Sequence, residues 1–112
     1  MCVAVLAIGD HVAPRMDGSE YAVLATVGHG NVLNAYVVDT HALHEPGFDD
    51  LLRRHHVRTV ICGDVSATER QRLEKLGVSV IADVKGSVCS VLFAHAAGTL
   101  RPGDEPSMPS RN

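Results

Sequence analysis

The expected fold is decided by the segment Cys2-Val3-Ala4-Val5-Leu6-Ala7-Ile8, which runs directly into Gly9-Asp10. A strand that is covered on one face alternates apolar and polar residues, whereas this one is apolar at odd and even positions alike. Both of its faces are therefore expected to be buried. We predict that residues 2–8 form the central strand of a sheet with helices on both sides.

Two more strands are predicted directly downstream, at residues 21–27 and 32–39. The loop before them contains Pro14, a turn signal. The link between them, residues 28–31, is so short that the two strands must form an antiparallel hairpin.

After the hairpin the pattern changes to helix periodicity. Three helices are predicted from apolar side chains at three- and four-residue spacing, starting near Phe48, at Ser66 and after Ser87. The apolar segments 57–62 and 78–82 are short strands between these helices. Helical connections make such strands parallel to their neighbours.

This order of elements predicts an α/β fold in which residues 1–100 form one domain. Right-handed crossovers place the first two helices on one face of the sheet and leave the third to cover the other face. A mixed five-stranded sheet in the order 3-2-1-4-5, with three helices, satisfies these conditions and is the ribonuclease H-like arrangement. Residues 101–112 are rich in Pro, Gly, Ser and charge, so we expect a disordered tail.

Composition excludes several classes of partner. The 112 residues carry a formal net charge of −3, without the basic excess of a nucleic-acid-binding protein. No apolar run approaches the roughly 18 residues of a membrane span. The three cysteines, Cys2, Cys62 and Cys89, are scattered rather than spaced as a disulfide framework, which indicates a reducing cytoplasm.

The predicted topology gathers chemically versatile side chains at one edge of the sheet. Ligands of open α/β sheets bind at the carboxyl ends of the parallel strands. The residues expected at this edge are Asp10, His11, Arg15, His41, His44, Cys62 and Asp64, and Asp83 follows the last strand at the same edge. Each also has an ordinary structural explanation, because Asp often forms turns after strands and free Cys often packs as a small apolar residue.

Backbone groups at the same edge suggest an anion pocket. Ser66 and Glu69 have the spacing of a capping box, so a helix starts there, and Gly63 would let a ligand approach closely. The same helix N-terminus is expected to lower the pKa of the Cys62 thiol, because it favours the thiolate, which is the preferred ligand of iron–sulfur clusters.

Several of these segments together resemble a known family. Residues 57–63 (Val-Arg-Thr-Val-Ile-Cys-Gly), 73–80, 85–88 and 97–100, with the loop 12–17, are similar to the dinitrogenase iron–molybdenum cofactor biosynthesis family, which includes NifX-type and NafY-type carriers. The resemblance covers residues 2–100. It implies a ribonuclease H-like fold without nuclease activity, and the binding of an iron–sulfur or iron–molybdenum cluster.

The resemblance also bears on individual residues. His44 corresponds to a histidine often seen before the family's first helix, and Cys62 to a cysteine found in some relatives. Arg15 stands where some carriers have a ligating histidine, and His11, four residues earlier, is a substitute that the family itself does not supply.

We therefore expect a non-catalytic carrier of an iron–molybdenum cofactor or an iron–sulfur precursor, with nitrogenase assembly proteins as partners. The expected metal ligands are Cys62, His11 and His44, and the remaining expected site residues are Arg15, Gly63 and Ser66. A metal-dependent nuclease is not expected, because that chemistry needs a carboxylate in the first strand and residues 3–8 contain none. The alternative is a regulatory or protein-interaction module that binds no ligand.

Overall fold

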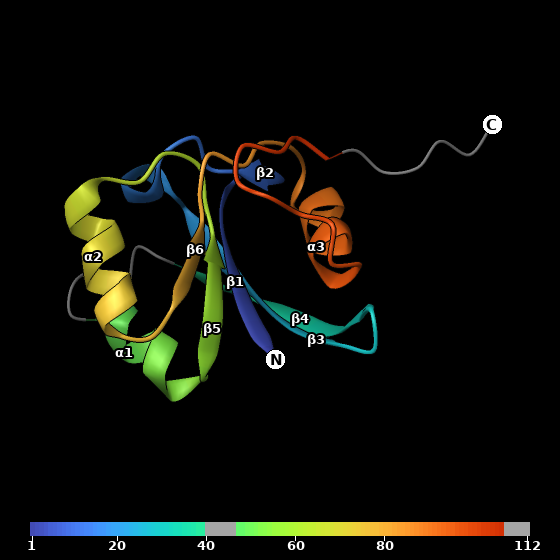
Figure 1. Cartoon of the computed structure of the whole chain (residues 1–112), viewed down its shortest axis with the longest axis horizontal. Coiled ribbons are helices and arrows are strands. Elements are labelled where there is room, and N and C mark those ends of the chain that lie inside the picture. The colour runs from blue at the N-terminus through green and yellow to red at the C-terminus, as the bar shows by residue number, and fades with distance from the viewer. Residues whose placement is uncertain (40–46, 107–112) are drawn as a thin grey trace.

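The computed structural model describes residues 1–39 and 47–106, which form a mixed sheet between helices (Figure 1). The predicted three helices are present. The elements are β1 (Cys2–Ile8), β2 (His11–Val12), the 3-10 helix η1 (Met16–Gly18), β3 (Tyr21–Gly28), β4 (Asn31–Asp39), α1 (Gly47–Arg54), β5 (Val57–Ile61), α2 (Ala67–Lys75), β6 (Ser79–Ile81) and α3 (Val88–Ala96).

The apolar segment at the N-terminus forms the central strand, as predicted. β1 pairs antiparallel with β3 along one side and parallel with β5 along the other. The strand order is β4-β3-β1-β5-β6, with β2 beside β1 and off this path. The predicted count of five strands is therefore wrong, because the sheet has six, and the predicted strand order leaves out one strand. The added strand is β2, which pairs antiparallel with the last two residues of β1.

The sheet separates two apolar cores, which explains why β1 is apolar at every position. Ala4 and Leu6 of β1 pack on the side of α1 and α2, against residues such as Leu52 and Leu73. Val3 and Val5 pack on the opposite side, with residues of α3 such as Val91. The prediction that two helices cover one face and the third helix covers the other is confirmed.

The helix starts follow the local sequence signals. At α2 the Ser66 Oγ accepts a hydrogen bond from the Glu69 N–H, and the Glu69 carboxylate accepts one from the Ser66 N–H, each at 3.1 Å. At α3 the Ser87 Oγ accepts from the Ser90 N–H at 3.1 Å. Both caps satisfy backbone donors that lack a partner inside the helix.

Residues 101–106, which were predicted to begin a disordered tail, are joined by backbone hydrogen bonds to the loop that follows β6. The Gly103 N–H donates to the Ala82 carbonyl and the Lys85 N–H donates to the Asp104 carbonyl, both at 3.0 Å. Composition did not reveal this docking because backbone hydrogen bonds need no apolar side chains. The remaining predicted tail, residues 107–112, lies outside the described residues.

The longest helices of the described ranges have nine residues, and none is long and apolar enough to cross a membrane.

Candidate functional site

A cleft of about 520 Å³ lies at the carboxyl ends of β1, β5 and β6, the edge at which the sequence places ligands. Its polar lining includes His11, Asp64, Asp83, Lys85 and Glu105, and we call it the carboxyl-edge cleft. The volume falls in the range of small-molecule sites. Three of these side chains are carboxylates and one is an ammonium group, so the lining is acidic.

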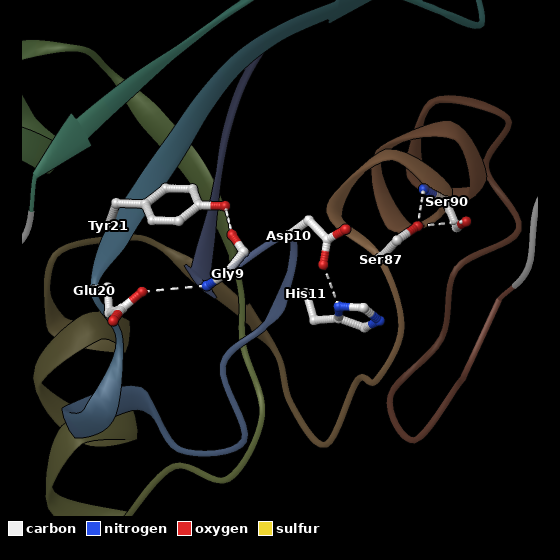
Figure 2. A network of polar contacts seen from close by, with 7 residues as sticks. All are labelled: Gly9, Asp10, His11, Glu20, Tyr21, Ser87 and Ser90. Carbon is white, nitrogen blue, oxygen red and sulfur yellow. Dashed lines mark hydrogen bonds and ion pairs between the residues drawn. The ribbon is translucent and has the colours of Figure 1, made fainter.

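The turn that carries His11 into the cleft is tied down on several sides (Figure 2). Gly9 has a φ of +60°, a conformation that glycine adopts without a steric cost. Its N–H donates to the Glu20 carboxylate at 3.2 Å, and its carbonyl accepts from the Tyr21 hydroxyl. The Asp10 carbonyl accepts from the Val88 N–H at 2.9 Å, which joins this turn to the start of α3.

His11 is held in an orientation suited to ligand binding. Its Nδ1 lies 2.5 Å from Oδ1 of Asp10, and its side chain remains 63% exposed (Figure 2). When Nδ1 carries the proton and donates it to this carboxylate, Nε2 keeps its lone pair. Histidines that ligate metals almost always donate their other ring N–H in this way. The predicted role of His11 is therefore compatible with its surroundings.

Cys62 does not reach the cleft as an available thiolate. Its side chain is fully buried and belongs to the apolar core under α1 and α2, beside residues such as Leu73. Burial raises the pKa of the Cys62 thiol to about 12, and the nearby Arg70 lowers it only in part. The expected lowering of this pKa is wrong, because loss of hydration outweighs the effect of Arg70, and the nearby carboxylates raise the pKa further. The thiol is neutral and packs as a small apolar group.

Gly63 allows a close approach, but the neighbour is the protein's own loop. A Cβ at this position would lie 2.3 Å from the Pro14 carbonyl oxygen and 2.4 Å from that of Ala13. The Asp64 N–H donates to the Pro14 carbonyl at 2.7 Å, and the Met16 N–H donates to the Asp64 carbonyl at 2.9 Å. Residues 13–14 therefore fill the space on the Cβ side of Gly63, while Gly63 itself forms part of the lining of the carboxyl-edge cleft.

The other predicted site residues are also accounted for. Ser66 is engaged in the capping box, so the Glu69 carboxylate occupies the helix start where an external anion was expected. Arg15 pairs with Asp64 through an isolated parallel bridge, and neither Arg15 nor Ser66 lines the cleft. His44, together with His41, lies outside the described residues.

Two charged residues of the cleft were missed in the sequence. Lys85 follows the strand 78–82, so its place at this edge could have been predicted from the topology. Glu105 was assigned to a disordered tail; the turn signal Pro102-Gly103 just before it was the available sign of order. Within residues 1–39 and 47–106, no three Cys, His, Asp or Glu side chains are grouped so that they could hold a metal ion.

Comparison with known proteins gives a fold and no family. No family model matches this chain, and no curated protein gives a significant match. The crystal structure of the protein PH0822 has a TM-score of 0.80 at 24% identity, over 91% of this chain and 96% of that one. The NMR structure of a "putative dinitrogenase (MJ0327)" from Methanococcus jannaschii has a TM-score of 0.74 at 17% identity, over 95% of each chain. A crystal structure of MJ0327 from Methanocaldococcus jannaschii has a TM-score of 0.72 at 16% identity, over 88% of this chain and 90% of that one.

Proposed function

We propose that this chain is a non-catalytic binding protein that carries an iron–molybdenum cofactor, or a related iron–sulfur precursor, at the carboxyl-edge cleft. The observation that carries the proposal is the Asp10–His11 pair, in which the carboxylate lies 2.5 Å from Nδ1 of an exposed imidazole at the edge of the cleft. Imidazole is a suitable ligand for iron, and its second-shell carboxylate fixes the tautomer that binds through Nε2.

The composition of the cleft favours a reversible hold on such a cargo. His11 is the imidazole of the described lining, and the Cys62 thiol is buried and neutral. A single exposed ligand leaves most of the coordination of a cluster to other donors, which suits a carrier that must release its cargo. The Lys85 ammonium group of the lining would attract an anionic cluster. We therefore expect the cargo to lie between His11 and Lys85 rather than against the carboxylates.

Two further points support the proposal. The sequence resembles the dinitrogenase iron–molybdenum cofactor biosynthesis family, and MJ0327, which shares the fold, bears the name of a dinitrogenase. The mixed sheet with two helices on one face and one on the other agrees with the ribonuclease H-like arrangement that the family resemblance implies. In this proposal the protein hands its cargo to nitrogenase assembly proteins.

The second candidate is an interaction module of the same fold that binds no ligand. The burial of Cys62 favours it, because this removes from the surface the one thiol that was expected to ligate a cluster. Anaerobic gel filtration separates the two candidates. The protein is incubated with isolated iron–molybdenum cofactor, or with Fe²⁺ and sulfide, and the iron and molybdenum that elute with it are measured.

The carrier proposal predicts metal retention by the parent protein, and a loss in His11→Ala together with a smaller loss in Asp10→Asn. Cys89→Ser removes an exposed thiol of α3 and His55→Ala an imidazole from the opposite edge of the sheet, so both should retain the parent amount. Equal retention by His11→Ala and the parent would exclude the cleft as the site. A parent that retains no metal would leave the ligand-free module.

A further inference from the structure

A second hollow lies at the opposite edge of the sheet, where α1 ends and β5 begins. It has a volume of about 370 Å³, and Figure 1 shows the end of α1 and the start of β5 at the opposite end of the strands from β2. Arg53, His56 and Arg58 form its polar lining. We call it the amino-edge hollow.

The floor of the amino-edge hollow is apolar. It is formed by Leu52, Val57, Leu76 and Val78, of which all but Leu76 are buried. Another open hollow, of about 410 Å³, adjoins the amino-edge hollow. Its lining shares His56 and Arg58 and adds His55 and the N-terminal Met1. Neither lining contains an Asp or Glu residue. This is an unusual concentration of basic groups in a chain whose net charge is −3.

The acidic residues of α1 do not neutralise these arginines, because other arginines engage them. Asp50 pairs with Arg54 at 2.7 Å, and Asp49 pairs with Arg72 at 3.3 Å. Among residues 1–39 and 47–106, the side chains of Arg53 and Arg58 have no hydrogen bond or ion pair. Two guanidinium groups thus line one hollow, and no described side chain engages their donors.

The turn that presents these groups is held in place. His56 lies between α1 and β5 with a φ of +55°, which is uncommon for a residue with a side chain. Its neighbour His55 is bonded through Nδ1 to the Tyr36 hydroxyl of β4 at 2.7 Å. Arg53 and Arg58 therefore flank a fixed turn, so little backbone order must be gained when a ligand binds.

We propose that the amino-edge hollow binds a small organic anion, in which a phosphate or carboxylate group is attached to an apolar body. The planar guanidinium groups of Arg53 and Arg58 are suited to bidentate hydrogen bonds with such oxygens. The apolar body covers the floor formed by Leu52 and Leu76. This site is separate from the carboxyl-edge cleft, and it does not depend on the carrier function proposed above.

The test uses phenyl phosphate as a probe with both features, inorganic phosphate as the anion alone, and benzyl alcohol as the apolar body alone. Each is titrated into the ¹⁵N-labelled full chain at constant ionic strength, because salt screens exposed charges. Phenyl phosphate should bind with a dissociation constant of about millimolar, as its size allows. It should shift the amide signals of residues 52–58 and 76–78, and bind more tightly than either half probe.

The variants distinguish a site from a diffuse positive charge. Arg53→Gln and Arg58→Gln should each weaken phenyl phosphate about tenfold, the effect of losing a hydrogen bond to a charged group. The matched control is Arg54→Gln, which removes the same charge one position along α1 from a guanidinium that Asp50 already engages. Its affinity should stay within about twofold of the parent. Equal losses in all three variants, shifts centred on the carboxyl-edge cleft, or no saturable shift would overturn the proposal.

Discussion

Gly63→Ala tests the finding that the loop at residues 13–14 packs closely against this glycine. The new methyl group would lie 2.3 Å from the Pro14 carbonyl oxygen and 2.5 Å from its carbonyl carbon. Both are backbone atoms, so no side chain can rotate away. Gly63 is not among the glycines with positive φ, so the expected effect comes from crowding alone.

The size of the effect follows from these contacts. Relieving them requires the loop to move by about 1 Å, and overpacking of this kind costs roughly 1–3 kcal/mol. The movement also disturbs the hydrogen bonds from Asp64 N–H to Pro14 and from Met16 N–H to Asp64, each worth about 1 kcal/mol. The reduced freedom of the unfolded chain offsets about 0.4–1 kcal/mol. We expect a net loss of roughly 2–4 kcal/mol.

The assay is equilibrium denaturant unfolding, with the thermal midpoint as a second readout. At about 4 °C per kcal/mol for a domain of this size, the midpoint should fall by roughly 8–16 °C. Gly18→Ala is the matched control, since a Cβ there meets nothing within 4 Å. It should leave the stability unchanged or slightly higher. If Gly63→Ala unfolds with the same midpoint as Gly18→Ala, the loop does not pack on Gly63 and the position is open to a ligand.

Two further predictions concern the corrected features. Because burial raises the pKa of the Cys62 thiol to about 12, the folded chain keeps this proton between about pH 9 and 12 while the unfolded chain loses it. The free energy of unfolding should therefore decrease as the pH rises, and the decrease should be steeper in the parent than in Cys62→Ala by up to about 1.4 kcal/mol per pH unit. Denaturant unfolding at pH 8 and pH 10 measures both slopes. Identical slopes would contradict a buried thiol. A chain ending at Leu100 should lose about 1–3 kcal/mol relative to one ending at Pro106, because the backbone hydrogen bonds of Gly103 and Asp104 to the loop after β6 are removed. Equal melting temperatures would show that residues 101–106 contribute nothing.

The parts of the fold that could be predicted from the sequence depend on neighbours within a few positions. The capping box of Ser66 and Glu69 and the apolar spacing of the helices are local signals, and the helices start where these signals place them. The continuous apolar character of residues 2–8 determined that β1 lies inside the sheet, because such a strand is stable only when both of its faces are covered. The edge that gathers His11 and Asp64 followed from the same topology.

The tertiary structure alone decided what each site residue contacts. Pro14 and Gly63 are far apart in the sequence, and no local pattern indicates that the loop containing Pro14 fills the space beside Gly63. Cys62 ends a strand at the predicted edge, but whether its thiol meets water or the core depends on the residues that α1 and α2 place over it. Residues 101–106 dock through backbone hydrogen bonds, which every sequence can form and composition therefore cannot reveal. Such contacts depend on the packing of distant segments, and only the complete fold brings those segments together.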